Sequence, residues 1–577
     1  MTDTAAVVND DPPQPPTPRV TAADRRALPN LDAIAESAAD KEGICSRVLP
    51  MRAVEVDTGR VSYIGAPCKS TLDSVCPACA KAARYVRMMQ CKEGWCLDAE
   101  PEVPKPETTA AQHDLLGARA HLFGEYQNAR AAGDDDMCES VVALVAELDQ
   151  ELRELGVRGP FPPLEARPKR KAKSTRRRDD VPDLPRLKVA KTTVGREYGG
   201  KYRPSTFFTL TLPSYGHINR VPDPSGEQVT DGSPRDPESY DYTRAARDIV
   251  HFKALWDRWV QNLRRAVGWN VQYFATVEPQ KRGAPHIHVA LRGSVPNAVL
   301  KQVTAATYRN IWWPHHDREV YRDGHMPVWD YQADTFVDPD TGQPLTSWED
   351  ALAVMDTVDE LEPSHTIRFG EQSKPVQILA GSDEQERKVR YLTKYLTKSV
   401  SEILTADSTR VAVHYDRLEE ELKHTPCSPT CGVWLRYGIV PKNAKAKMVS
   451  GRCKGKAHRR DTLGLPGQRV LASGLWTGKT VADHKADRAE FVRQTLAAVG
   501  ITRPERPELR ITPVRPGDKD APPRSHLIIA TVSERIRQRA EYDSARLVLA
   551  QSPPGDDREQ SIEQVVQQRN SQFSDAA

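Results

Sequence analysis

The stretch Gly283-Ala-Pro-His-Ile-His-Val-Ala-Leu291 carries the most informative pattern in the chain. Alternate side chains of a β-strand point to opposite faces, so His286 and His288 share one face. The apolar residues at positions 287, 289 and 291 then share the other face, as in a strand that is buried on one side only. The pattern predicts a strand with two imidazoles on its polar face. Because a His-x-His pair alone is a weak motif, two exposed polar residues without a ligand are the alternative.

A second strand is predicted at Val271-Gln-Tyr-Phe-Ala-Thr-Val-Glu278, and the residues Pro279–Pro285 are predicted to be the loop that connects the two strands. Pairing as an antiparallel hairpin would bring Glu278 opposite His286. One carboxylate and two imidazoles with open coordination positions are typical of a site for Mg²⁺ or Mn²⁺ that acts on phosphate. Glu278, His286 and His288 are therefore the predicted catalytic metal ligands.

A tyrosine and lysine repeat occurs in Val389-Arg-Tyr-Leu-Thr-Lys-Tyr-Leu-Thr-Lys-Ser399. Tyr391 and Tyr395 are four residues apart, and so are Lys394 and Lys398. This spacing predicts a helix with both tyrosines on one face and a lysine about one turn after each. A tyrosine that attacks a phosphodiester must lose its proton, and a lysine can offset the charge of the transferred phosphate. The alternative is an ordinary amphipathic helix.

Together with the strand Thr206-Phe-Phe-Thr-Leu-Thr-Leu212, these segments resemble the HUH endonucleases, specifically the rolling-circle replication initiators of plasmids and single-stranded DNA phages. The family motifs match Thr209–Thr211 (Thr-Leu-Thr), His286 and His288 (His-hydrophobic-His), and Tyr391/Lys394 with Tyr395/Lys398 (Tyr followed at the third place by Lys). The doubled tyrosine is similar to the two-tyrosine phage initiators, whereas many plasmid initiators have a carboxylate where Tyr391 stands. Within the family the chain is similar to the RepSA-like initiators of actinobacterial plasmids and integrative elements, from about Ile44 to Phe491.

The resemblance implies an α+β fold, a ferredoxin-like palm with an antiparallel sheet and helices on one face. An amphipathic helix expected at Arg244–Val267, between the first strand and the hairpin, fits the same class. The implied activity is nicking and rejoining of one strand of origin DNA, single-stranded or in a supercoiled duplex, through a 5′-phosphotyrosine. We predict Tyr395 as the first nucleophile, and Tyr391 as the second nucleophile or as a group that positions water. Lys394 and Lys398 would assist both.

Two other functions fit the same residues. A conjugative relaxase or a single-strand transposase uses the same chemistry, although relaxases often place the nucleophile ahead of the histidines, whereas here it follows them. A zinc-dependent DNA-binding regulator without catalysis is the other alternative. Such a regulator would keep its function when both tyrosines are replaced by Phe.

The chain contains ten cysteines, several of them clustered, and clustering in a long chain without secretion signals indicates metal binding rather than disulfides. Cys76-Pro-Ala-Cys79 is a knuckle of the kind that binds structural zinc. The likeness to RepSA-like initiators implies Cys45 and Cys68 as its partners, whereas spacing alone equally allows the cysteines at 91 and 96.

A second zinc site is predicted from a cluster that also contains His424, with Cys427, Cys431, Cys453 and His458 as the preferred ligands. Ordinary free thiols are the alternative, because Cys-x₃-Cys is a looser signature than Cys-x₂-Cys.

Composition excludes a membrane protein, since 38% hydrophobic residues in 577 form no apolar run of membrane-spanning length and the N-terminus has no signal-peptide pattern. We therefore expect a cytoplasmic protein. The formal net charge of +3 does not by itself indicate DNA binding. DNA binding is indicated instead by the basic runs at Arg167–Arg178 and Lys442–Arg460, because local cationic segments attract phosphate backbones.

The predicted organisation is a disordered tail (1–30), a zinc-binding cysteine region (31–106), a helical hairpin (107–165), a basic linker (166–200), the endonuclease domain (201–420), a basic Cys/His region (421–495) and a mostly disordered tail (496–577). Within the last tail a helix is expected near Ile528–Leu549. Gly474-Leu-Trp-Thr-Gly-Lys-Thr480 is one residue too short between its glycines for a phosphate-binding loop. Without an ATPase of its own, the protein is expected to depend on a host helicase and a DNA polymerase.

Overall fold

The computed structural model describes residues 30–97, 99–102, 108–159, 161–165, 178–186, 196–465, 469–502, 507–515 and 517–551. The chain forms two compact units. Unit 1 comprises Met1–Gly94, Asp383–Ile403 and Lys479–Ala577, and unit 2 comprises Trp95–Ser382 and Leu404–Gly478. Each unit thus combines segments that lie far apart in the chain, whereas the ranges expected from the sequence are consecutive. Residues 1–29 of the expected N-terminal tail, and 166–177 and 187–195 of the expected linker, lie outside the described residues.

Unit 2 contains a five-stranded antiparallel sheet in the order β13-β3-β7-β6-β15. Its strands are β13 (Val376–Ala380), β3 (Arg203–Thr211), β7 (Pro285–Arg292), β6 (Tyr273–Pro279) and β15 (Val470–Ala472). The three central strands confirm the predictions made from alternating polarity. The α+β class with an antiparallel sheet is confirmed as well.

Helix α6 (Tyr242–Val267) packs on the apolar face of this sheet. The ring centroid of Trp259 lies 5.0 Å from that of Phe208 on β3, and Trp256 lies 5.1 Å from Tyr273 on β6. The apolar residues of β7 at 287, 289 and 291 are fully buried. Because one face of the sheet is dry, the alternating residues, which include both histidines, must lie on the opposite face.

The ends of α6 are fixed by local chemistry. The Asp241 side chain accepts a hydrogen bond from the backbone N–H of Arg244, which caps the first turn. Gly268 ends the helix in the left-handed region, with φ of 76°.

Unit 2 also contains the smaller elements that surround the sheet. They are β4 (Ile218–Pro222), β5 (Gln228–Pro234), α7 (Asn297–Ala305), β8 (Tyr308–Ile311), β9 (Val328–Asp330), β10 (Thr335–Val337), β11 (Thr346–Ser347), α8 (Trp348–Thr357), β12 (His365–Arg368), α11 (Thr409–His424), the 3₁₀ helices η1 (Gly432–Tyr437) and η2 (Lys456–His458), and β14 (Ile439–Val440).

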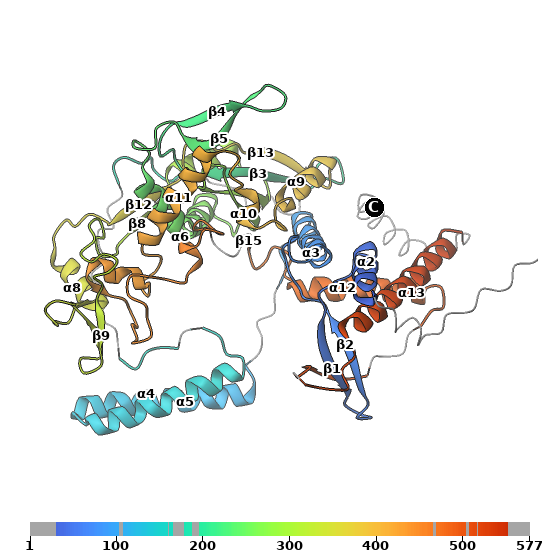
Figure 1. Cartoon of the computed structure of the whole chain (residues 1–577), viewed down its shortest axis with the longest axis horizontal. Helices are drawn as coiled ribbons and strands as arrows, with labels where there is room; N and C mark the ends of the chain where they lie inside the picture. Colours follow the sequence, from blue (N-terminus) through green and yellow to red (C-terminus); the bar gives the residue numbers. More distant parts are fainter. Residues whose placement is uncertain are drawn as a thin grey trace, which may run out of the picture. The chain divides into compact units, whose positions relative to one another are not determined.

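Helices α4 (Ala110–Ala132) and α5 (Asp135–Glu154) lie side by side as a helical hairpin (Figure 1). Buried residues of both helices, including Tyr126 and Val141, form its core. Thr109 and Gln112 form a capping box at the start of α4, and Gly133 ends it with φ of 73°.

Unit 1 consists of a small sheet and six helices in the described residues. Strands β1 (Leu49–Glu55), β2 (Val61–Ala66) and β16 (Leu509–Pro513) pair antiparallel in the order β16-β1-β2. The helices are α2 (Leu31–Lys41), α3 (Pro77–Trp95), α9 (Asp383–Thr393), α10 (Val400–Ile403), α12 (Val481–Ala497) and α13 (Arg524–Gln551).

Within the C-terminal range that was expected to be mostly disordered, the helix predicted near Ile528–Leu549 is present as α13, whereas β16 was not predicted. Leu527, Ile528 and Val532 of α13 are buried in a core that also contains Ala35 and Ala39 of α2. The apolar side of α13 is therefore stabilised by a partner from the other end of the chain, which local composition could not indicate. Residues 552–577 lie outside the described residues.

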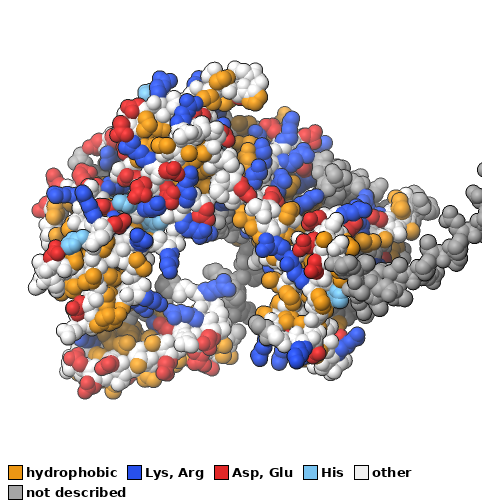
Figure 2. Space-filling view, in the orientation of Figure 1, with side chains coloured by type: hydrophobic (Ala, Val, Ile, Leu, Met, Phe, Trp, Pro, Cys, Tyr) orange, Lys and Arg blue, Asp and Glu red, His pale blue; other side chains and the backbone are white. Residues whose placement is uncertain are grey.

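Positive and negative side chains are interspersed over the face seen in Figure 2, as the near-neutral net charge suggests. Within the described residues, no helix has the length and apolar character that a membrane crossing requires.

Candidate functional site

Strands β3, β6 and β7 bring the predicted metal ligands together. The register of β6 and β7 pairs Glu278 with His286, as predicted from the sequence. The register of β3 and β7 pairs Thr209 with His288 and Thr211 with His286. Since paired residues on adjacent strands project to the same side, Glu278, His286 and His288 all lie on the face away from α6.

The donor atoms of these side chains converge. His286 Nε2 and His288 Nε2 are 2.9 Å apart, and Glu278 Oε2 is 3.8 Å from His288 Nε2. One donor atom from each residue lies within 4.8 Å of the others. The other ring nitrogen of His288, Nδ1, is 2.7 Å from the hydroxyl of Thr209. A hydrogen bond at Nδ1 orients the ring and leaves Nε2 for the shared site.

The electrostatics of His286 fit a metal ligand. Burial, followed by the nearby charge of Arg282, lowers the pKa of His286 to about 4. The imidazole is therefore neutral near pH 7, which is the form that binds metal. Its buried Nδ1 has no hydrogen-bond partner among the described residues. Two ligands at right angles about 2.1 Å from an ion lie about 3.0 Å apart, close to the observed separation of the Nε2 atoms.

Arg282 fixes the loop that joins β6 and β7. Its guanidinium donates to the carbonyl oxygens of Leu212 and Pro213, at 2.8 and 2.7 Å, and to the side chain of Gln280 at 2.9 Å. The loop is thus tied to the end of β3, so the three strands that carry the site form one rigid support.

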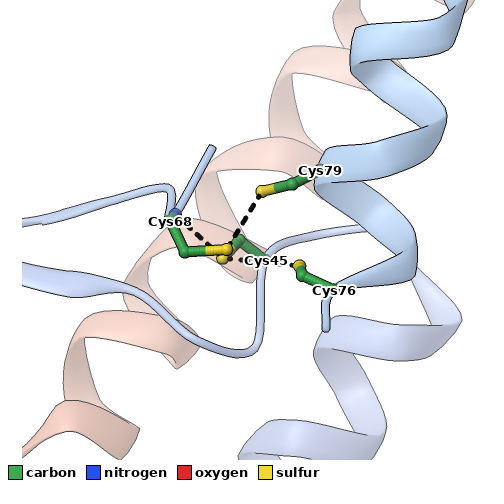
Figure 3. Close-up of side chains that lie close together, drawn as sticks. All are labelled: Cys45, Cys68, Cys76 and Cys79. Carbon is green, nitrogen blue, oxygen red and sulfur yellow. Dashed lines mark hydrogen bonds between the residues drawn. The ribbon is translucent and has the colours of Figure 1, made fainter. Parts of the chain in front are cut away.

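Four cysteines of unit 1 converge in a second cluster (Figure 3). Cys76 immediately precedes α3, and Cys79 lies in its first turn. The Sγ atom of Cys76 is 3.7 Å from that of Cys45, and the Sγ atom of Cys79 is 3.8 Å from that of Cys68. Cys91 and Cys96, which spacing alone also allowed, are not part of the cluster. Burial, followed by the neighbouring Cys45 thiol, raises the pKa of Cys79. Four facing thiols can bind a metal such as zinc, which holds them as thiolates.

Cys427, Cys431, Cys453 and His458 of unit 2 form a third cluster. The Sγ atoms of Cys427 and Cys453 are 3.9 Å apart, and Cys431 Sγ is 3.5 Å from His458 Nε2. His458 Nδ1 lies 2.8 Å from the carbonyl oxygen of Leu422, which directs Nε2 toward the sulfurs. This set can also bind zinc.

His424, which the sequence placed near the same cysteines, lies outside the third cluster. Its two ring nitrogens are 2.8 Å from Glu319 and 3.3 Å from Glu420. His424 therefore belongs to a polar network with Glu319 and Glu420. The third cluster has four donor residues without it.

The tyrosine repeat lies in unit 1, whereas Glu278, His286 and His288 lie in unit 2. Tyr391 is in the last turn of α9 and is 44% exposed. Tyr395 is half-buried, and the Nζ atom of Lys394 lies 5.0 Å from the centroid of its ring. Lys394 and Lys398 are exposed.

The prediction of one continuous helix through this repeat is wrong, because α9 ends at Thr393. From there the backbone changes to bonds between residues three apart, such as Lys394 N–H to Tyr391 C=O at 3.2 Å and Lys398 N–H to Tyr395 C=O at 3.3 Å. The buried hydroxyl of Thr393 donates to the carbonyl oxygen of Val389 at 2.9 Å. Such back-bonding by a β-branched residue competes with helix continuation.

A basic groove in unit 2 was missed by sequence reasoning. A hollow of about 1070 Å³ is lined by Lys281, Arg282 and Lys301, and it shares Arg244 and Arg368 with an adjoining pocket of about 420 Å³. The groove also includes Thr211, the residue paired with His286. Its cations come from separate elements, so no local basic run indicates them.

His365 lines the pocket that adjoins the groove and pairs with the buried carboxylate of Asp248. Asp248 is 1% exposed, and its Oδ1 is 2.7 Å from His365 Nε2, while Oδ2 accepts a hydrogen bond from the Tyr215 hydroxyl at 3.0 Å. Arg178 and Arg247 also line this pocket. Because its four arginines outnumber the carboxylates of Asp180 and Asp241, the lining has a net positive charge, which favours an anionic ligand.

Comparison with known proteins gives one family. A family model described as "RepSA: Replication initiator protein, pSAM2" matches residues 31–534. A curated protein described as "Replication initiator protein", from Streptomyces ambofaciens, is 27% identical over 270 residues. That alignment covers 40% of this chain and 52% of the relative, so the chain spans about half of the relative's length. No solved structure matches the chain.

We predict that the purified protein holds about two zinc ions per chain, one in each thiolate-containing cluster. Replacing Cys76 by Ser, or Cys431 by Ser, should each reduce zinc content by about one ion, because three ligands close the site poorly. Elemental analysis by mass spectrometry measures this. Cys138→Ser is the matched control, since Cys138 is a buried thiol of the α4–α5 hairpin. Absence of zinc from folded protein would contradict both sites.

Proposed function

Because the chain belongs to the RepSA family of replication initiator proteins, we propose that it starts rolling-circle replication of a plasmid or integrative element by nicking and rejoining one strand at the origin. The observation that carries this proposal is the convergence of Glu278, His286 and His288 on one face of an antiparallel sheet. The hydroxyl of Thr209, from the first family motif, contacts His288 and supports the same reading. We further propose that the sheet and α6 form the ferredoxin-like palm of an HUH endonuclease.

The proposed reaction is a transesterification. The phenolic oxygen of Tyr395 attacks the phosphorus of the origin phosphodiester, and the phenolic proton passes to solvent. A bond forms between tyrosine and the 5′ phosphate while the bond to the 3′ oxygen breaks. The leaving 3′ oxygen takes up a proton and becomes a free hydroxyl for a DNA polymerase. One phosphodiester replaces another, so the reverse attack rejoins the strand without ATP.

The donor set fits a divalent cation with oxygen and nitrogen ligands, Mg²⁺ or Mn²⁺. His286 and His288 would hold it through their Nε2 atoms, and Glu278 through its carboxylate. When bound, the ion polarises the scissile phosphate and offsets its negative charge. Neutral His286 leaves a nitrogen lone pair available, and the Thr209 contact at Nδ1 of His288 directs Nε2 of that ring toward the shared site.

Lys394 and Lys398 would offset the charge that develops on the phosphate. Their exposure, and the exposure of Tyr391, support access to a DNA strand. Tyr391 would act in a second transfer that ends the round, or position water. The tyrosines belong to unit 1 and the Glu278 group to unit 2.

We propose that the basic groove of unit 2 binds the origin strand. Its exposed lysines, Lys281 and Lys301, can contact phosphates, and its lining reaches Thr211 beside His286 in the sheet. Phosphate contacts of this kind give affinity and position without reading sequence. Strand separation would fall to a host helicase. The two zinc clusters would have a structural role.

Replacing the tyrosines one at a time tests the chemistry. With a single-stranded origin oligonucleotide whose short 5′-side fragment, ending in the new 3′ hydroxyl, diffuses away, Tyr395→Phe should abolish the covalent adduct, because the phenolic oxygen is lost. Tyr391→Phe should still form the adduct and fail mainly at termination. Peptide mapping by mass spectrometry identifies the attached residue.

Tyr331→Phe is the matched control, because Tyr331 is 83% exposed and lies in unit 2. DNA attached only at Tyr391 would reverse the order of the two tyrosines. DNA attached at neither, with unchanged DNA binding, would support a regulator without catalysis.

Replacing both Lys281 and Lys301 by Ala should weaken binding of single-stranded DNA and reduce the slope of log affinity against log salt by about 1.4, roughly 0.7 for each lost phosphate contact. Fluorescence anisotropy over a series of salt concentrations measures both effects. Lys253→Ala, an exposed lysine of α6 outside the groove, should leave the slope unchanged. Equal slopes for the wild type and the double variant would exclude this groove as the DNA path.

A further inference from the structure

The Cys45, Cys68, Cys76 and Cys79 cluster lies within the hydrophobic core of unit 1. Three of its thiols are buried with Ala35 and Ala39 of α2 and with Leu527 and Ile528 of α13. The cluster thus joins, within one core, the loop from Cys68 to Cys76 and the first turn of α3.

The loop between Cys68 and Cys76 contacts the segment that follows the tyrosines. The backbone N–H of Asp73 donates to the carbonyl oxygen of Thr397 at 2.8 Å. The backbone N–H of Ser399, followed by the side chain of Ser74, the next residue of the loop, lowers the pKa of Glu402. Glu402 in turn accepts the backbone N–H of Ser399 at 2.6 Å, and its own N–H donates to the Ser399 hydroxyl at 3.1 Å. The C-terminal flank of the repeat is thus tied to the loop between the cysteines.

Helix α3 contacts the segment that precedes the tyrosines. Lys92, near the end of α3, forms an ion pair with Glu386 of α9. The first turn of the same helix carries Cys79, so one rigid element joins the thiolate cluster to α9. The tyrosine repeat at 391–398 is consequently held on both sides, by Glu386 before it and by Thr397 and Glu402 at its end.

We propose that the zinc cluster of unit 1 positions the nucleophilic tyrosines, with Ser74 and Lys92 as the positioning residues that transmit its geometry. This inference rests on the proposed function for the role of the tyrosines. Between Glu386 and Thr397 the repeat leaves α-helical geometry after Thr393, so a continuous helix does not fix the orientation of Tyr395. The contacts to the loop between Cys68 and Cys76 and to α3 fix it instead. Loss of zinc would then disable strand transfer without changing any group that touches DNA.

Charge reversal at the α3 contact tests the proposal. Lys92→Glu should speed amide hydrogen exchange in residues 387–398 and slow adduct formation, each by about fivefold, as expected when a partly exposed ion pair becomes a like-charge pair. Zinc content and affinity for the oligonucleotide should stay unchanged. Adding Glu386→Lys to this variant restores opposite charges and should return both quantities to the wild-type values. Lys81→Glu, an exposed position on the same helix, is the matched control.

Ser74→Ala provides a second, independent variant, since Ser74 is exposed and its hydroxyl can be removed without disturbing the core. It should also slow adduct formation with zinc retained. Wild-type exchange and wild-type adduct rate in both variants would overturn the inference. If the wild type itself forms no adduct, the proposed function fails, while the exchange measurement still decides whether α3 positions the segment. Release of zinc by a thiol reagent without any change in exchange at 387–398 would also overturn it.

Discussion

The alternation of side chains along β7 is the constraint on which the candidate site depends. Ile287, Val289 and Leu291 are fully buried on the face that α6 covers, so the strand cannot shift by one residue without moving three apolar side chains into a polar environment. This fixed register places His286 and His288 on the opposite face. The pairing of β7 with β6 and β3 then adds Glu278 and Thr209 to the same face. Hydrophobic burial on one side of the strand therefore determines the geometry of the polar site on the other.

A second level of organisation joins elements from distant parts of the chain. Unit 1 combines the cysteine cluster, the tyrosine repeat and the last helix, while unit 2 contains the sheet, the basic groove and the second cysteine cluster. In the proposed chemistry the nucleophile belongs to unit 1 and the metal ligands belong to unit 2. The cysteine cluster of unit 1 would then have to position the nucleophile accurately, because a displacement of the nucleophile by about 1 Å can lower the rate roughly 100-fold.

Local patterns explain what could be predicted from the sequence. The central strands, α6 and the pairing of Glu278 with His286 follow from periodicity and a short connecting loop, which neighbouring residues encode. The outer strand β15 and the burial of α13 against α2 depend on partners far away in the chain, and no local signal marks them. The end of α9 was missed because the Tyr and Lys spacing favours a longer helix, whereas buried Thr393 favours its end. The groove was missed because its cations are brought together only by folding.

The central claim, that Glu278, His286 and His288 hold a divalent cation, is tested most directly by electron paramagnetic resonance during titration with Mn²⁺, with both cysteine clusters loaded with zinc. The wild type should bind one Mn²⁺, and this binding should be lost when His286 and His288 are replaced by Ala. His217→Ala, at an exposed histidine of the same unit, should bind as the wild type does. Undiminished Mn²⁺ binding by the His286 and His288 double variant would show that these histidines do not hold the cation.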